Sequence, residues 1–106
     1  MSEIQITQGY NGSQVSAHVG DTLTIALPEI PATGFRWTPD TVDAKILSFA
    51  GDEFQPGSQS GVGGGGIHVF RFAAQATGST QVRCTLARPW ETTSPRDVFN
   101  IQVSVS

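Results

Sequence analysis

A glycine-rich run at 61–66 is the first segment of this chain whose composition suggests chemistry. The residues Gly61-Val62-Gly63-Gly64-Gly65-Gly66 satisfy the G-x-G-x-x-G pattern, in which backbone N–H groups hold the pyrophosphate of a dinucleotide. That chemistry needs a helix after the glycines, because the helix N-terminus meets the phosphates. The run is followed instead by 67–72, whose alternation of residue types predicts a strand. We therefore reject nucleotide binding and expect a flexible loop, or one whose own backbone approaches another group closely.

The single cysteine, Cys84, and the two histidines, His18 and His68, are the residues from which a nucleophilic or metal site would be built. Cys84 shares the parity of Val82 and Leu86 in an alternating segment, which predicts a buried and unreactive thiol. The histidines lack the paired spacing of zinc sites, so we expect surface or hydrogen-bonded side chains. One cysteine also excludes an internal disulfide. We predict no catalytic residue, no metal and no cofactor, and an enzyme is the least favoured class.

Trp90 is the strongest candidate for a binding residue. It lies in the segment Arg88-Pro89-Trp90, next to polar residues that predict a loop between the last two strands. Trp and Arg dominate binding hot spots, and a proline between them restricts the backbone. The sequence leaves two possibilities, a ring folded back over the rim of the protein or one held out as a contact. Trp37, in contrast, shares a strand face with Phe35 and is expected in the core.

Alternation of apolar and polar residues places these candidates on short strands separated by turns. We expect strands at 3–7, 15–19, 22–27, 35–38, 46–49, 67–73, 80–86 and 98–105. Pro28 should end the third strand because proline cannot donate to a ladder, and 29–34 should form an exposed loop. A long Gly-, Ser- and Gln-rich connection is expected at 51–66. Four acidic residues are assigned to turns, where such side chains stabilise the local backbone: Asp40, Asp43, Asp52 and Glu53.

The composition favours an all-β fold. Charged residues make up 14% of the 106 residues, and the Lys, Glu and Leu that form helix faces are scarce. Seven to eight short strands in roughly 100 residues are typical of an immunoglobulin-like antiparallel β-sandwich. The composition does not change along the chain, so we expect a single domain over 1–106.

Charge and hydropathy argue against two classes of partner. The net charge is −3, and Lys45 and the scattered arginines do not form the basic stripe that nucleic acid or an anionic membrane requires. No apolar stretch approaches the ~20 residues of a membrane span. The N-terminal residues lack the features of a signal peptide, which fits a cytoplasmic protein and equally the mature form of a periplasmic or secreted one. We expect a monomer, because no strand displays an apolar outer face.

Three segments together resemble a known family. They are Pro31-Ala32-Thr33-Gly34-Phe35-Arg36-Trp37, Gly61-Val62-Gly63-Gly64 and Arg88-Pro89-Trp90. In order and spacing they resemble the N-P-T-T-G-[FY]-x-W, G-x-G-G and R-P-W segments of the chagasin family, which are protein inhibitors of papain-like cysteine peptidases. The resemblance spans essentially the whole chain. Ile30 stands where the family usually has Asn, and Ala32 replaces the first Thr.

The resemblance implies a reversible, tight-binding inhibitor whose three loops enter the active-site cleft of the peptidase as a wedge. Thr33 and Gly34 would approach the catalytic Cys–His pair, with the glycine run along one flank of the cleft and Trp90 along the other. The implied peptidase-binding residues are Pro31, Ala32, Thr33, Gly34, Phe35, Gly61, Val62, Gly63, Gly64, Gly65, Gly66, Arg88, Pro89 and Trp90. The alternative is a non-inhibitory immunoglobulin-like binding or adhesion module, since this fold serves many functions.

Overall fold

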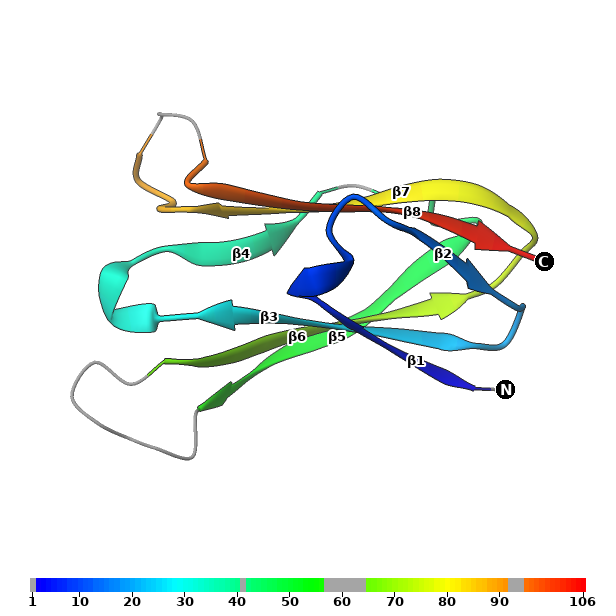
Figure 1. The fold of residues 1–106 in the computed structure, drawn as a ribbon, viewed down its shortest axis with the longest axis horizontal. Coiled ribbons are helices and arrows are strands. Elements are labelled where there is room, and N and C mark those ends of the chain that lie inside the picture. Colours follow the sequence, from blue (N-terminus) through cyan, green and yellow to red (C-terminus); the bar gives the residue numbers. More distant parts are fainter. Residues whose placement is uncertain (1, 41, 57–64, 92–94) are drawn as a thin grey trace.

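The computed structural model describes residues 2–40, 42–56, 65–91 and 95–106. Their strands form two stacked sheets (Figure 1), in the orders β1-β3-β6-β5 and β2-β8-β7-β4. The predicted immunoglobulin-like β-sandwich is thus confirmed. None of the helices in these described ranges is long and apolar enough to cross a membrane. The elements are β1 (Glu3–Thr7), η1 (Gln8–Tyr10), β2 (Gln14–Ala17), β3 (Thr22–Glu29), η2 (Pro31–Thr33), β4 (Arg36–Pro39), β5 (Leu47–Pro56), β6 (Gly66–Ala74), β7 (Gly78–Ala87) and β8 (Asp97–Val105).

Two edge strands pair in parallel, whereas the other neighbours pair antiparallel. β1 runs parallel to β3, with Ile4 opposite Leu23, and β2 runs parallel to β8, with Val15 opposite Val103. Between these two strands the chain crosses from one sheet to the other (Figure 1). Alternation in a sequence indicates a strand but carries no information about the direction of its neighbour, so these two pairings could not be predicted.

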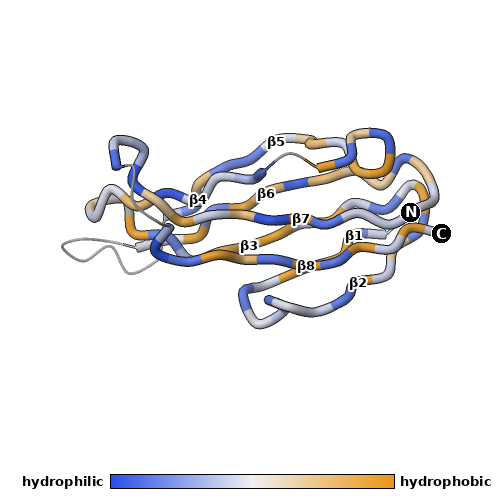
Figure 2. The backbone as a smooth tube through the Cα atoms, turned by 90° about the horizontal axis from the view of Figure 1, so that it is seen from above, coloured by the Kyte–Doolittle hydropathy of each residue, from blue (hydrophilic) through white to orange (hydrophobic). Residues whose placement is uncertain are grey.

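The core lies between the sheets and uses the alternating positions that the sequence predicts. The apolar residues recur along the strands in Figure 2. Trp37 is buried, as predicted, and so is Cys84. Burial raises the pKa of the Cys84 thiol to about 12, which makes it a core side chain and not a nucleophile. Alternate residues of β3 and β8 are buried in the same core: Leu23, Ile25, Leu27, Phe99, Ile101, Val103 and Val105.

The expected end of a strand at Pro28 is wrong, because β3 continues to Glu29. The Pro28 carbonyl accepts the indole N–H of Trp37 at 2.7 Å. In a strand, the nitrogen and the carbonyl of one residue face the same edge, so the missing N–H of Pro28 is turned away from β6. The ladder between β3 and β6 therefore passes Pro28 without losing a bond. Glu29 is consequently buried and does not lie in an exposed loop.

The prediction of a long connection at 51–66 is also wrong, because β5 runs to Pro56 and pairs with β6 as far as Gly66. Asp52 and Glu53 accordingly lie in a strand and not in turns. β5 is an edge strand with mostly exposed side chains, so it shows no apolar alternation. Its hydrogen bonds come from β6, which is remote in sequence and gives no local signal.

Four residues that were expected in strands lie outside them: His18, Val19, Phe35 and Ile46. β2 ends at Ala17, and Val19 is 50% exposed in the turn that follows. Phe35 precedes β4 and is only partly buried, because its N–H donates to the Thr33 hydroxyl at 3.3 Å and so belongs to the preceding turn. Phe35 therefore does not share the core position of Trp37.

Asp21 stabilises the connection between β2 and β3 in a pH-dependent way. Its carboxylate accepts the backbone N–H groups of His18 and Ser2, both at 2.9 Å. These bonds favour the ionised form and lower the pKa of Asp21, the bond from His18 having the larger effect. A lowered folded-state pKa gives stability that is present above the unfolded-state pKa and is lost as the pH falls through the folded value. We expect Asp21→Asn to reduce the urea midpoint at neutral pH and to approach the wild type in acid; an equal reduction at all pH values would contradict this account.

Candidate functional site

The segments that flank all three candidate loops meet at one end of the sandwich, opposite the two termini (Figure 1). The connection between β3 and β4 lies there, and so do the last residues of β5, the first residues of β6 and the connection between β7 and β8. Gly61, Val62, Gly63 and Gly64, which were predicted as contacts, lie outside the described residues. The described part of the site is therefore 30–35, 65–66 and 88–91.

The first segment is a compact turn held by its own threonine. The Ile30 carbonyl accepts both the backbone N–H of Thr33, at 3.1 Å, and the Thr33 hydroxyl, at 2.6 Å. Gly34 follows with φ +81°, a left-handed conformation that glycine adopts without strain. The turn is closed by the Ile30 carbonyl, which any residue supplies. The Asn that the family usually has at this position is therefore not needed to close it.

The side chain of Ile30 connects this turn to the glycine run. It is 49% exposed, and its Cγ1 lies 3.2 Å from the point that a Cβ on Gly65 would occupy. Gly65 thus allows a close approach between the two segments. Gly66 has a different role, because a Cβ there would overlap the Gln55 carbonyl of β5. The packing of β5 against β6 by itself requires a glycine at 66.

Trp90 lies on Gly34 and is nevertheless 70% exposed. A Cβ on Gly34 would lie 2.5 Å from Cη2 of the indole and 3.0 Å from Cζ2, so the ring rests against the glycine backbone. Both possibilities that the sequence left open are realised in part. The ring is positioned by an intramolecular contact, and most of its surface remains free for a partner.

Arg88 joins the third segment to the first. Its Nε donates to the Thr33 carbonyl at 2.9 Å, and its guanidinium lies 4.3 Å from the centre of the Phe35 ring. Its Nη1 lies 3.4 Å from Glu91 in the same loop. Together with the contact between Trp90 and Gly34, these bonds hold the two loops in a fixed relation.

A buried polar network at the base of the site was missed by the sequence analysis. His68 and Glu29 are each 6% exposed, and the imidazole Nδ1 lies 3.0 Å from Glu29 Oε1. Its Nε2 lies 2.6 Å from Asp52 Oδ2, and Glu29 Oε1 also accepts the backbone N–H of Trp37 at 2.7 Å. Each ring nitrogen of His68 thus lies within hydrogen-bond distance of a carboxylate oxygen, one on β3 and one on β5. The network therefore connects the stems of the first and second loops.

The structure confirms the prediction that the histidines are surface or hydrogen-bonded residues. His18 is exposed, and its Nδ1 lies 3.1 Å from the Ser106 hydroxyl. His68 has partners on both ring nitrogens. No group of three or more metal-ligating side chains with the geometry of a metal site is found in the ranges that the structure describes. The described residues of the site thus present an exposed aromatic ring, that of Trp90, beside the turn that contains Gly34.

Residues 16–103 match the model of the family described as chagasin family peptidase inhibitor I42. The chain belongs to the chagasin family. It is 31% identical over 91 residues to chagasin from Trypanosoma cruzi, covering 81% of this chain and 82% of that protein. Membership of a peptidase inhibitor family establishes that the protein is an inhibitor and not an enzyme, and it disfavours the alternative of a non-inhibitory module.

Solved structures share the fold of this chagasin-family member. The cysteine protease inhibitor EhICP2 from Entamoeba histolytica superposes with a TM-score of 0.88 at 19% identity, over 100% of this chain and 97% of that one. PbICP-C, solved in complex with falcipain-2, gives a TM-score of 0.67 at 20% identity, over 99% of this chain and 92% of that one. At these identities the likeness establishes the fold, and the sequence relationship to chagasin carries the family.

Proposed function

We propose that this chain inhibits papain-like cysteine peptidases by inserting its three loops into the active-site cleft. The target class is supported by family membership and by PbICP-C, a relative in fold that was solved in complex with falcipain-2. The contact residues would be those of the turn around Gly34, the glycine run and the segment of Trp90. Binding would be reversible, since no group of the described site is placed to react.

The main support for the proposal is that the first loop (30–35) and the third loop (88–91) already contact each other without a partner. Arg88 bonds to the Thr33 carbonyl, and Trp90 rests on Gly34. Loops that are already ordered lose little conformational entropy on association, so more of the contact energy appears as affinity. A site of this kind supports tight binding through an interface of ordinary size, about 1,600 Å².

The turn at 30–34 would also protect the inhibitor from cleavage by the peptidase. A substrate must present an extended peptide bond to the catalytic thiolate. Here the hydroxyl and N–H of Thr33 both close the turn onto the Ile30 carbonyl, and Gly34 follows in a left-handed conformation. The turn therefore fills the cleft without offering an extended bond to cleave.

The test is a titration of the purified chain into papain, in which the remaining peptidase activity is measured as the rate of hydrolysis of a fluorogenic peptide. We expect reversible inhibition at roughly nanomolar concentrations, a binding free energy of about −12 kcal/mol, and an intact inhibitor afterwards. Absence of inhibition at micromolar levels, with papain and with cathepsin-L-like enzymes, would overturn the proposal and favour a binding module.

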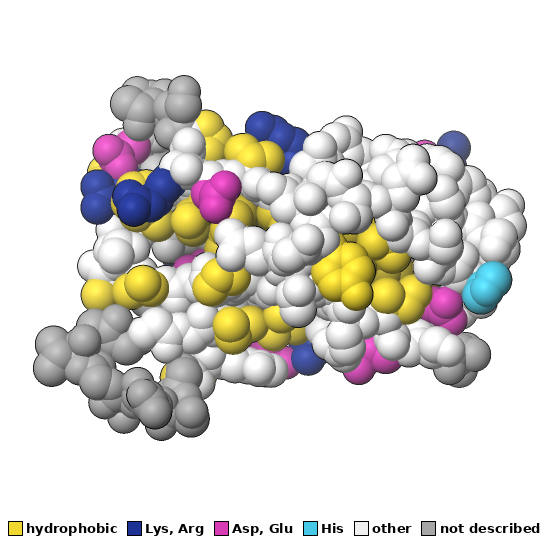
Figure 3. Space-filling view, viewed as in Figure 1, with side chains coloured by type: hydrophobic (Ala, Val, Ile, Leu, Met, Phe, Trp, Pro, Cys, Tyr) yellow, Lys and Arg dark blue, Asp and Glu magenta, His cyan; other side chains and the backbone are white. Residues whose placement is uncertain are grey.

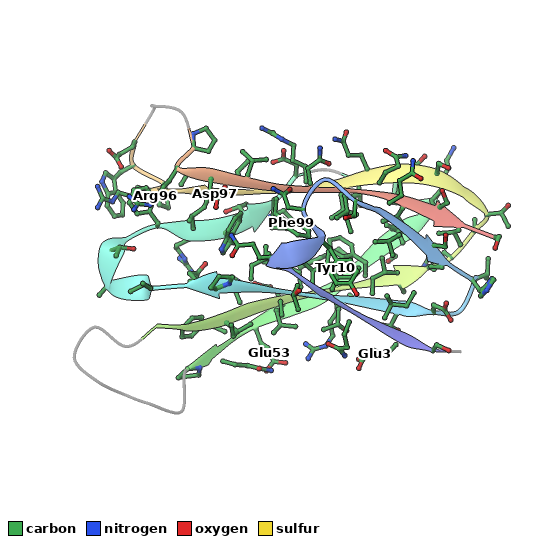
Figure 4. The ribbon with its side chains drawn as sticks, in the orientation of Figure 1. Glu3, Tyr10, Glu53, Arg96, Asp97 and Phe99 are labelled. Atoms are coloured by element: carbon green, nitrogen blue, oxygen red, sulfur yellow. The ribbon has the colours of Figure 1, made fainter. Side chains whose placement is uncertain are left out.

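Trp90→Ala should weaken inhibition of papain by more than about tenfold, the loss expected for a hot spot of ~2 kcal/mol. The physical reason is the large exposed ring surface, which would be buried against the wall of the cleft. Tyr10→Ala is the matched control, because Tyr10 is an exposed aromatic residue on η1, away from the loop end (Figure 4). An unchanged inhibition constant for the Trp90 variant would remove this residue from the site.

A further inference from the structure

Apolar side chains surround a hollow beside the first loop. Ile30, which follows β3 and is about half exposed, lines this hollow of about 350 Å³ together with Pro28, Phe35, Trp37 and Leu86. Figure 3 shows hydrophobic side chains at the surface of this end of the molecule, next to basic ones. A single exposed apolar residue is common on a protein surface, whereas several around one hollow indicate a place where a partner binds.

The charged side chains that line the same hollow are engaged with other groups of the chain: Glu29, Arg88, Arg96 and Asp97. The two carboxylates accept the backbone N–H groups of Trp37 and Val98, at 2.7 and 2.8 Å. The two guanidinium groups lie over the Phe35 ring, at 4.3 and 5.0 Å from its centre. Arg96 and Asp97 lie side by side where β8 begins (Figure 4). Two formal positive charges and two negative ones balance, so the hollow has no excess of either sign.

The fold does not require an isoleucine at position 30. The turn is closed by the Ile30 carbonyl, which any residue supplies, and the side chain lies outside the buried core. The side chain lies instead where the first loop meets the glycine run, with its Cγ1 3.2 Å from the Cβ position of Gly65. An apolar side chain is thus exposed between two of the segments that would enter the cleft.

Ile30 and Trp90 lie on different sides of the first loop. The hollow beside Trp90 is lined by Phe54 of β5, whereas the hollow beside Ile30 is lined by Asp97 of β8. Seen from above, β5 and β8 lie toward opposite edges of the molecule (Figure 2). When the loop enters a cleft, Trp90 would therefore face one wall and Ile30 the other.

We propose that Ile30 is a specificity-determining contact, which forms with its hollow an apolar subsite for an apolar side chain on the wall of the peptidase cleft. This inference rests on the proposed function and names a residue that distinguishes among its targets. An apolar side chain that packs there loses only water. A charged one would lose its hydration beside as many like charges as opposite ones, which is unfavourable. The chain should therefore discriminate among papain-like peptidases by the polarity of this wall.

The experiment measures inhibition constants and dissociation rates of four proteins: the wild type, Ile30→Ala, Ile30→Val and Val19→Ala. Val19→Ala is the matched control, because Val19 is 50% exposed, as against 49% for Ile30, and its N–H donates to the carbonyl of the C-terminal Ser106, at the far end of the molecule. The probes are two papain-like peptidases chosen from their structures. One has apolar side chains on both walls of its cleft, and the other has charged side chains there.

With the apolar-walled peptidase, Ile30→Ala should raise the inhibition constant about tenfold, mainly through faster dissociation. Ile30→Val, which loses one methylene group, should raise it by a smaller factor. With the charged-walled peptidase, Ile30→Ala should change the inhibition constant by less than about twofold, because no apolar contact is lost. Val19→Ala should inhibit both peptidases like the wild type.

Equal losses for Ile30→Ala with both peptidases would overturn the proposal and assign Ile30 to positioning the glycine run through Gly65. If the wild type inhibits both peptidases and Ile30→Ala is unchanged with each, this inference fails and the proposed function stands. If the wild type inhibits neither peptidase, the proposed function itself fails.

Discussion

Gly34→Ala is expected to abolish tight inhibition while the sandwich stays folded. Gly34 has φ +81°, and an L-residue in this conformation costs roughly 1–2 kcal/mol. The added Cβ would also lie 2.5 Å from Cη2 of Trp90, so the indole must leave its place. One methyl group therefore disturbs both the turn and the aromatic ring that are proposed to enter the cleft. We expect an inhibition constant weaker by a factor on the order of 100, or about 2.7 kcal/mol.

Gly12→Ala is the control that separates the effect of backbone strain on stability from the effect of the clash with Trp90 on inhibition. Gly12 has φ +83°, and no atom lies within 4 Å of the position of its Cβ, so this variant carries the strain without a clash. Both variants should lose similar stability in thermal unfolding, whereas inhibition should be lost only in Gly34→Ala. In a Trp90→Ala background, Gly34→Ala should cost less than it does alone, because the clash is gone. A Gly34→Ala variant that inhibits papain like the wild type would contradict the proposed arrangement of the loops.

His68→Leu is expected to have the largest effect on stability. His68 is buried between two carboxylates, and its removal leaves the buried Glu29 with the backbone N–H of Trp37 as its remaining partner. Leaving a buried carboxylate without one of its hydrogen-bond partners typically costs at least about 1–3 kcal/mol, because the hydration that it lost on burial is no longer offset. Urea unfolding at neutral pH measures this loss directly.

Two further variants identify the cause of that loss. Adding Glu29→Gln to His68→Leu should recover much of the stability, because the amide oxygen still accepts the Trp37 N–H and no charge remains buried. Asp52→Asn should cost less than His68→Leu, because the Asp52 side chain is 43% exposed and water replaces its bond. If the double variant is no more stable than His68→Leu, the loss comes from packing against Phe70, on which the imidazole stacks.

The network also bears on inhibition. Glu29 and Trp37 lie at the two ends of the first loop, and Asp52 and His68 lie on the strands that flank the second. Since one imidazole connects both stems, a change at His68 should loosen two loops at once. The contact residues themselves would be unchanged. The association rate constant should therefore fall by a larger factor than the dissociation rate constant rises.

Much of the fold follows from local residue patterns. The alternation in β8 and the placement of Trp37 and Cys84 in the core could be predicted, because a half-buried strand repeats every two residues. β5 could not be predicted, since it is an edge strand with mostly polar side chains that is held by its pairing with β6. The continuation of β3 through Pro28 depends on an indole from β4, nine residues farther along the chain.

The sequence by itself determined which short segments of this protein have unusual composition: a proline–threonine–glycine turn, a glycine run and an Arg-Pro-Trp segment, each recognisable because its residues are contiguous. Only the tertiary structure decided that Arg88 bonds to Thr33, that Trp90 rests on Gly34, and that Arg96 adds its charge beside Phe35. These contacts join residues 55 to 61 positions apart, and for Arg88 and Thr33 the separation is 55. They exist because β4 and β7 pair in one sheet and bring their loops to the same end. A side chain's partner across such a distance depends on strand order and register, which local alternation does not encode.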